Sequence, residues 1–295
     1  MIAASMACPI CDDTGWKAID VDGVRRMVRC DCWRSAITST LVDEARIPAR
    51  YQNCTFDTFE TNHDSLRDAH RRATDFATRF PVVERGLLFY GQPGVGKTHL
   101  ATAILRAVIR TRGARGRFYE TSELLRLLRE TYGTGTRVNE MDILRPVMEA
   151  DLLVLDDLGQ EKTSDWVQET LGLLINTRYA SRRPTIITTN LADSPDVSDP
   201  NSIAFRVGLR TRSRLLEMCD WVPMSGYDVR EIGPHPTPDE LARYHAKSPA
   251  AQTGGRTRPP SKVQDVRPRA QLKSRIPTGR DPRMELKWTG GKAGT

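Results

Sequence analysis

The sequence predicts an α/β fold in which a parallel sheet is covered by helices on both faces. Two observations support this class. Between residues 50 and 232, short apolar runs of strand length alternate with longer segments of helical character. A glycine-rich turn also joins the first of these runs directly to the first helical segment.

The predicted elements follow one another in a regular order. The predicted strands are Gly86–Tyr90, Arg117–Thr121, Leu152–Leu155, Pro184–Thr189 and Trp221–Met224. The predicted helices between them are Thr98–Arg110, Glu123–Thr131, Asp165–Ala180 and Ser202–Cys219. In the first helix, Leu100, Ala103 and Ile104 repeat at helical spacing. The fourth strand is rich in β-branched residues, which favour extended backbone.

The chain divides into three predicted regions, and 295 residues are more than one typical domain needs. Residues 1–49 hold a cluster of cysteines, residues 50–232 form the α/β core, and residues 233–295 form a tail. The tail starts with Pro-His-Pro-Thr-Pro, includes a short helical stretch at Asp239–His245, and continues with Gly, Pro, Arg and Lys. Because this last part has little to bury, we expect it to be disordered.

The net charge of +7 is unevenly distributed. From His245 to Thr295 there are 12 Lys and Arg against 3 Asp and Glu, whereas residues 1–244 hold 32 against 34. The basic tail is therefore either a solvated terminus or an arm that follows the phosphates of DNA. The body, being near neutral, gives no electrostatic argument for nucleic-acid binding.

The hydropathy of the chain indicates a soluble protein. Hydrophobic residues make up 39% of the chain, the mean hydropathy is −0.47, and no apolar run approaches the roughly 18 residues of a membrane span. The start of the chain lacks the features of a signal peptide. We therefore expect a cytoplasmic protein with no membrane partner.

A phosphate-binding loop lies between the first core strand and the first core helix. The stretch Gly91-Gln-Pro-Gly-Val-Gly-Lys-Thr98 fits G-x-x-x-x-G-K-[ST] at every position. Its backbone N–H groups and the following helix N-terminus suit phosphates, Lys97 would reach the β- and γ-phosphates, and Thr98 would ligate Mg²⁺. The predicted ATP-binding residues are Gly91, Gln92, Pro93, Gly94, Val95, Gly96, Lys97, Thr98 and the adjoining His99.

Polar residues end two further predicted strands. Asp156 and Asp157 follow Leu152–Leu155, where the first would hold Mg²⁺ and the second would polarise the attacking water. Asn190 follows the fourth strand, where it would hydrogen-bond that water or the γ-phosphate. A solvated acidic strand end and a simple turn asparagine are the alternative interpretations.

Four cysteines form two close pairs near the start of the chain. Cys8 and Cys11 have the spacing C-x₂-C, and Cys30 and Cys32 have the spacing C-x-C. Four thiolates on two tight turns suit a structural Zn²⁺, although a redox pair remains an alternative. The two isolated cysteines, Cys54 and Cys219, are interpreted as buried small hydrophobic residues and not as metal ligands.

Arginines recur in the predicted helix Ser202–Cys219, at positions 206, 210, 212 and 214. One interpretation is that they form a solvated basic face. The other is that one of them is directed at the γ-phosphate of a neighbouring subunit. Their spacing alone does not choose between these.

Together these motifs resemble the DnaC/DnaI-type replicative helicase loaders and their IstB-like transposition relatives, a branch of the AAA+ ATPases. The resemblance extends over Tyr51–Arg230 and more loosely over the cysteine region. It rests on Tyr-Gly-Gln-Pro-Gly-Val-Gly-Lys-Thr-His-Leu-Ala, Leu-Val-Leu-Asp-Asp-Leu-Gly, Arg-Pro-Thr-Ile-Ile-Thr-Thr-Asn-Leu and Ser-Arg-Leu-Leu-Glu-Met-Cys.

The resemblance implies further roles. Arg214 matches the arginine finger that acts across a subunit interface, Arg230 matches sensor 2, and Asn190 matches sensor 1. Ser164 and Trp166 match a hydroxyl and an aromatic contact to single-stranded DNA, although Trp166 could equally be a core tryptophan. The resemblance also implies that the amino-terminal module contacts the helicase, as it generally does in such loaders, while nucleic-acid binding by the cysteine module remains an alternative.

The chain departs from the family pattern in two places. Asp157 stands where AAA+ enzymes usually have Glu, and the shorter side chain would slow hydrolysis. No helical lid domain follows Arg230, in keeping with the loader branch.

The resemblance implies an ATP-hydrolysing loader that places a replicative DNA helicase on single-stranded DNA. ATP would close an interface of a homo-oligomer, with the neighbour supplying Arg214. Two alternatives stay open: a transposition helper that acts on duplex DNA, and a nucleotide-switched adaptor that does not hydrolyse ATP.

Overall fold

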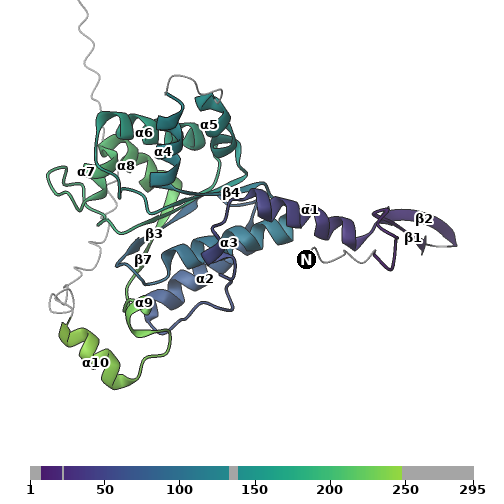
Figure 1. Ribbon diagram of the computed structural model, residues 1–295, viewed down its shortest axis with the longest axis horizontal. Coiled ribbons are helices and arrows are strands. Elements are labelled where there is room, and N and C mark those ends of the chain that lie inside the picture. Colours follow the sequence, from purple (N-terminus) through teal and green to yellow (C-terminus); the bar gives the residue numbers. More distant parts are fainter. Residues whose placement is uncertain (1–7, 22, 133–138, 248–295) are drawn as a thin grey trace, which may run out of the picture. The chain divides into compact units, whose positions relative to one another are not determined.

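A computed structural model of the chain describes residues 8–21, 23–132 and 139–247 (Figure 1). The described residues belong to one compact unit, Met1–Ser248. The part of the tail predicted to be disordered, from residue 248 onward, lies outside the described residues.

The helices and strands alternate along the core as predicted. Their bounds are β1 Trp16–Val21, β2 Val24–Arg29, α1 Asp31–Glu44, the short 3₁₀ helix Ala49–Tyr51, α2 Asp64–Arg79, β3 Gly86–Gly91, α3 Lys97–Arg112, β4 Gly116–Glu120, α4 Thr121–Glu130, α5 Glu140–Glu149, β5 Leu152–Asp156, α6 Asp165–Ala180, β6 Thr185–Thr189, α7 Ile203–Val207, α8 Leu209–Met218, β7 Cys219–Met224, α9 Val229–Ile232 and α10 Pro238–Lys247.

The core sheet has five strands in the order β4-β5-β6-β3-β7, and all of its pairings are parallel. This confirms the predicted parallel α/β core. The strand β3, which carries the phosphate loop, lies between β6 and β7. Because all five strands run the same way, their carboxyl ends meet at one edge of the sheet.

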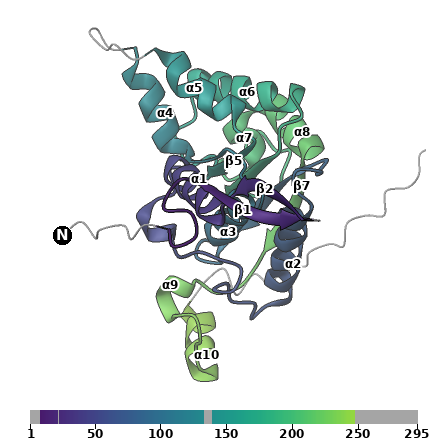
Figure 2. The same cartoon turned by 90° about the vertical axis from the view of Figure 1, so that its right-hand side faces the viewer.

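Alternate residues of the central strands pack into two separate hydrophobic clusters, one on each face of the sheet. Leu152 and Val154 of β5 face the cluster formed with α2 and α3, whereas Leu153 and Leu155 face α4, α5 and α6. Figures 1 and 2 show these two helical layers on opposite sides of the sheet. The nearly continuous apolar runs of the strands are thus explained by burial on both faces.

The prediction of one continuous helix is wrong. The stretch Ser202–Cys219 forms two helices, α7 and α8, which are separated at Gly208. Gly208 has φ 82° and ψ 152°, a conformation that is essentially restricted to glycine. All other predicted helix and strand limits differ from the observed ones by two residues or fewer.

Several elements were not predicted. Helix α2 carries buried Leu66, Ala69, Ala73 and Phe76 at helical spacing, so its signal was present in the sequence. The antiparallel hairpin β1–β2 was harder to detect, because its described side chains are mostly exposed and show no alternation of burial. Figure 2 shows this hairpin together with α1, which follows it.

The end of α1 joins the cysteine region to the sheet. Ala45 and Ile47 are buried in the cluster that includes α2 and α3. The Phe118 N–H donates to the Ala45 carbonyl over 2.7 Å, and Arg117 pairs with Glu44 over 3.1 Å. Among the described residues, no helix combines the length and the apolar character that crossing a membrane requires.

Candidate functional site

A cavity of about 640 Å³ opens at the carboxyl edge of the sheet. Most of the sequence-predicted nucleotide residues line it, namely Pro93, Gly94, Val95, Gly96, Lys97, Thr98, His99, Asp156, Asp157, Asn190 and Arg230. The strand order brings the ends of β3, β5 and β6 to this edge, so Pro93 and Asn190, which are far apart in the sequence, share one cavity. Gly91 and Gln92 lie directly beside it, through carbonyl groups that contact Lys97.

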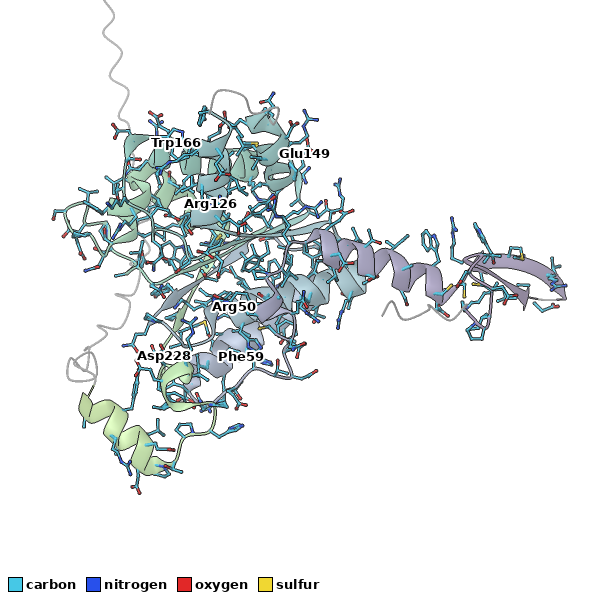
Figure 3. All side chains as sticks on the ribbon, viewed as in Figure 1. Arg50, Phe59, Arg126, Glu149, Trp166 and Asp228 are labelled. Carbon is cyan, nitrogen blue, oxygen red and sulfur yellow. The ribbon has the colours of Figure 1, made fainter. Side chains whose placement is uncertain are left out.

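Two glycines of the loop are required by their surroundings. Gly94 has φ 76°, and a Cβ there would lie 1.8 Å from Oδ1 of Asp228. Gly96 has φ 94°, and a Cβ there would lie 2.6 Å from the ring of Phe59. Larger residues would therefore displace segments on either side of the loop. Figure 3 labels Asp228 and Phe59, together with Arg50, in this part of the molecule.

Lys97 is almost completely buried, with 6% of its surface exposed. Its Nζ donates to the carbonyl oxygens of Gly91 and Gln92 over 2.9 and 2.6 Å. Burial lowers the pKa of Lys97 to about 8, although Asp157 and Asp156 oppose this shift. Within the described part of the chain, no carboxylate forms an ion pair with Lys97, and such an unpaired cation suits an incoming phosphate.

Asp156 is buried at the end of β5 and accepts a hydrogen bond from Oγ1 of Thr188 over 2.7 Å. Burial raises the pKa of Asp156, while the hydroxyl groups of Thr188 and Thr98 act in the opposite direction. Asp156 and Thr98 therefore lie together and offer hard oxygen ligands, which Mg²⁺ prefers.

Asp157 has a left-handed backbone, with φ 57°. Its N–H donates to Oγ1 of Thr188 over 2.8 Å, and its Oδ1 accepts from Nδ2 of Asn190 over 2.9 Å. Burial raises the pKa of Asp157, and the Gln160 side chain partly offsets this. The structure thus places Asn190 in direct contact with the second carboxylate of the site.

Several cavity residues were missed by the sequence analysis. Glu120 and Thr188 are polar residues at the ends of β4 and β6, a signal that was available in the sequence. Arg50, Phe59 and Tyr227 come from loops and short helices, and no local pattern marks them. Other such lining residues are Tyr51, Cys54, Thr58, Glu60, Asn62, Val229 and Pro234, while Leu66 comes from the longer helix α2.

The segment that carries Arg230 is bonded to the phosphate loop. The Val229 N–H donates to the Gly94 carbonyl over 3.3 Å, and Asp228 caps α9 by accepting from the Arg230 N–H. Arg230 itself is exposed toward the cavity. A positive side chain is therefore available in the same cavity as Asp156 and Asp157.

The four arginines of α7 and α8 differ in their surroundings. Arg206 donates to the carbonyls of Pro200 and Glu161, and Arg212 pairs with Asp193. Arg210 is exposed, whereas Nη1 of Arg214 is buried with no hydrogen-bond partner among the described residues. Arg214 does not line the cavity of its own chain.

Ser164 and Trp166 lie at the start of α6, away from the cavity. Ser164 caps the helix by accepting from the Val167 N–H over 3.3 Å. Trp166 is half-buried, with the guanidinium of Arg129 4.6 Å from its ring centroid and Tyr132 at its edge. Figure 3 shows Trp166 on the side of the sheet that carries α4 to α6. Trp166 is thus neither fully buried nor fully exposed. Its position alone does not choose between a contact to DNA and a place in the core.

The four cysteines of the first region converge. The sulfur atoms of Cys8, Cys11, Cys30 and Cys32 all lie within 4.8 Å of one another. A Zn–S bond of about 2.3 Å in a tetrahedron separates sulfurs by about 3.8 Å. The Cys8 and Cys30 sulfurs are 3.9 Å apart, and those of Cys11 and Cys32 are closer, at 3.2 Å. A hydrogen bond with Cys32 lowers the pKa of Cys11 to about 7. The donor set thus fits a closed zinc site.

The isolated cysteines differ from each other. Cys219 is fully buried in the core, and burial raises its pKa to about 12. Cys54 is only half-buried and lines the cavity, so it is not the core residue that the sequence suggested.

A parallel sheet that carries this loop at the end of the inner strand β3, with two acidic residues at the end of β5 in the same cavity, defines a P-loop nucleotide-binding protein. The chain belongs to the family of IstB-like ATP binding proteins, which it matches over residues 36–195. Both the AAA+ class and the family resemblance predicted from the motifs are thereby confirmed. The matched region begins inside α1 and leaves out the four cysteines.

Similar proteins include the replicative helicase loader DnaC of Escherichia coli K12, 28% identical over 141 residues, or 48% of this chain and 56% of that protein. The chain thus spans little more than half the length of this relative. A crystal structure of the DnaC helicase loader is 35% identical, with a TM-score of 0.54, covering 60% of this chain and all of that one. The replication initiator DnaA bound to AMPPCP and single-stranded DNA shares the fold, at 18% identity, a TM-score of 0.51, and coverage of 67% and 60%.

Proposed function

We propose that this protein is an ATP-dependent loader of a replicative DNA helicase, which binds ATP and single-stranded DNA. The observation that carries the proposal is the single cavity that joins Lys97, Asp156, Asn190 and Arg230. The DnaC helicase loaders among its relatives support the choice of partner.

The chain's own residues divide the work on ATP. Lys97 and the loop N–H groups would bind the phosphates, and Arg230, which lines the same cavity, would bind near the γ-phosphate. Thr98 and Asp156 would hold Mg²⁺, which neutralises charge on the phosphates. Asp157 and Asn190, already hydrogen-bonded to each other, would orient the attacking water.

Arg214 would act on the ATP of a neighbouring chain. It lies outside its own cavity and carries a buried Nη1 with no partner in the described part of the chain. A second copy that places its cavity against α8 would give this cation an anionic partner. We therefore propose a homo-oligomer that closes when ATP binds.

The cysteine region would bind Zn²⁺ and present the surface that contacts the helicase. Several apolar side chains of the hairpin and its surroundings are exposed, namely Ile10, Ile19, Val24, Met27 and Ile37. Exposed apolar residues gathered in one small module are typical of a protein–protein interface. Zinc would stabilise this module, which has few buried apolar side chains of its own.

Ser164 and Trp166 would contact single-stranded DNA. Stacking of a base on Trp166 is worth about 1–3 kcal/mol, so we expect Trp166→Ala to weaken binding of a fluorescent oligonucleotide about 5- to 150-fold. Arg129, whose guanidinium lies over the same ring, supplies a cation beside it. Trp33→Ala, in the cysteine region, is the matched control; equal losses in both variants would contradict a specific role.

The proposal is tested by ATP turnover with no DNA, with single-stranded DNA and with duplex DNA, using Lys97→Ala as the blank. Stimulation mainly by single strands supports the loader. Stimulation mainly by duplex DNA would instead indicate a transposition helper. Binding of ATP without turnover in any condition would contradict hydrolysis and favour a nucleotide-switched adaptor. Capture of a replicative helicase by the wild-type chain, and its loss after deletion of residues 1–44, tests the partner.

A further inference from the structure

Arg50 is an exposed cation that lines the nucleotide cavity. It belongs to the short 3₁₀ helix Ala49–Tyr51, which precedes the core sheet in the sequence. Figure 3 labels it on the same side of that sheet as Phe59, another lining residue. Lys97 and Arg230 enter the cavity from the phosphate loop and from α9. Arg50 thus adds a positive side chain from the amino-terminal part of the chain.

The Arg50 guanidinium is not committed to a carboxylate. Within the described residues it forms no ion pair, and its hydrogen bond goes from Nη2 to the hydroxyl of the neighbouring Tyr51. Its Cζ lies 4.4 Å from the centroid of the same ring. The hydrogen bond with Tyr51 raises the pKa of Arg50, and the charges of Asp156 and Glu120 act in the same direction. The side chain is therefore charged and can exchange a neutral partner for an anion.

The backbone that carries Arg50 is anchored on both sides. Ile47 before it is buried in the hydrophobic cluster of α2 and α3. Tyr51 after it packs against the same cluster, with its ring centroid 6.1 Å from that of Phe118. The Tyr51 N–H also donates to the Pro48 carbonyl over 2.8 Å. The exposed side chain of Arg50 is consequently the part of this segment that can respond to a ligand.

Asp156 indicates which part of ATP Arg50 would meet. Asp156 and Thr98 would hold Mg²⁺, an ion that bridges the β- and γ-phosphates in P-loop proteins. Arg50 and Asp156 line the same cavity, and Asp156 is close enough to raise the pKa of Arg50. Arg50 would therefore lie near the terminal phosphates. A guanidinium binds phosphate through two parallel charge-assisted hydrogen bonds, which are among the stronger polar interactions.

The segment of Arg50 continues directly from the cysteine region. Cys32 lies in α1, and Ala45 follows the last residue of this helix. Ala45 is fully buried, and its carbonyl accepts from the Phe118 N–H of β4 over 2.7 Å. Five residues separate this anchor from Arg50. A ligand that draws on Arg50 would therefore act on the end of α1 and, through that helix, on the region before it.

We propose that Arg50 binds the γ-phosphate of ATP in its own chain, so that the amino-terminal region responds to ATP and not to ADP. The guanidinium turns from Tyr51 toward the phosphate, and α1 takes a position that depends on the bound nucleotide. The surface proposed to contact the helicase would change with it. This inference rests on the proposed function, because it requires ATP in the cavity.

The affinities of the full chain for two nucleotides test the phosphate contact. The Kd values of a non-hydrolysable ATP analogue and of ADP are measured by fluorescence in the presence of Mg²⁺. Arg50→Ala should weaken binding of the analogue about tenfold or more and that of ADP less than about twofold, because only the analogue has a γ-phosphate. Arg50→Lys keeps the charge but loses the planar fork, so it should weaken the analogue only about threefold.

Arg46→Ala is the matched control. Arg46 also lies over a tyrosine ring, with its Cζ 4.9 Å from the centroid of Tyr119, but it does not line the cavity. It should bind both nucleotides as the wild type does. Equal losses of analogue and of ADP in Arg50→Ala, or no loss of either, would overturn the inference while ATP binding by the protein still stands. If the wild type does not bind the analogue, the inference and the proposed function both fail.

Amide hydrogen exchange of residues 31–51 tests the response of the amino-terminal region. In the wild type, the analogue should slow exchange at the end of α1 about twofold or more relative to ADP. In Arg50→Ala the two nucleotides should give the same exchange, whereas Arg46→Ala should keep the difference. A wild type that shows no difference, or an Arg50→Ala variant that keeps it, would overturn the role of Arg50 in this response.

Discussion

Lys97 is held in the free protein by neutral carbonyl groups instead of an acidic partner. Its Nζ donates to the Gly91 and Gln92 carbonyls, and Asp156 and Asp157 are further away in the same cavity. Burial therefore lowers its pKa to about 8. The Lys97 ammonium, which would bind phosphate, therefore loses part of its positive charge just above neutral pH.

The affinity for ATP should consequently depend on pH. Phosphate would favour the charged ammonium, so the pKa of Lys97 rises on binding and affinity stays constant below pH 8 but falls above it. The measurement is the Kd of a non-hydrolysable ATP analogue between pH 7.5 and about 9.5, where each unit above the free pKa weakens binding up to about tenfold. Lys97→Arg, which remains charged, should show a flat profile. An unchanged wild-type Kd over this range would contradict the expectation.

At the scale of elements, a buried arginine joins α5, α6 and β6. Arg178 of α6 is fully buried, and burial lowers its pKa to about 9. Its Nη1 donates to the last carbonyls of α5, those of Val147 and Met148, and to that of Ala150. Its other nitrogens donate to the Pro184 carbonyl and to Oγ1 of Thr185. One side chain thus satisfies the end of a helix and the start of a strand.

Replacing this arginine should destabilise the core strongly. Arg178→Ala leaves several buried carbonyls without a donor, and we expect a loss of about 3–5 kcal/mol in the free energy of unfolding. Urea denaturation followed by circular dichroism measures this loss. Arg182→Ala, whose side chain is exposed two residues after α6 ends, should change stability by less than about 0.5 kcal/mol. Similar values for the two variants would show that the bonds of Arg178 contribute little.

The cysteine region should depend on metal as a separate element. We expect one zinc ion per chain by atomic emission, and its loss in Cys30→Ser, because four thiolates are needed to close the site. Protease cleavage within residues 8–44 should then increase while binding of an ATP analogue stays unchanged. Cys54→Ser, outside the cluster, should keep its zinc. A metal-free wild type with oxidised cysteines would favour the redox alternative.

At the scale of the whole molecule, the proposed site is complete only between two chains. Lys97→Ala and Arg214→Ala should each abolish turnover alone, since one lacks the phosphate cation and the other lacks the cation supplied to its neighbour. Mixing the two variants creates interfaces with both residues intact, so part of the activity should return. Arg210→Ala, one turn earlier on α8, should leave turnover unchanged. Failure of the mixture to recover any activity would contradict a role of Arg214 in the neighbour's site.

The sequence alone predicted the parts of this protein whose information lies in contiguous residues. The phosphate loop needs its glycines, Lys97 and Thr98 within eight positions, between a strand and a helix, and the structure has the loop there. The parallel sheet followed from strands with two buried faces, and the cysteine cluster from two short spacings. Even the error at Gly208 was local, since a single glycine with positive φ divided one predicted helix.

Only the tertiary structure decided which residues lie next to these locally predicted motifs. The strand order β4-β5-β6-β3-β7 has no local signal, yet it places Glu120 beside Asp156 and Thr188 against Asp157. The burial of Arg178 also had no local signal, because an arginine on a helix is usually solvated. A local motif determines which chemistry a residue can perform. The pairing of distant strands determines which other residues are close enough to share it.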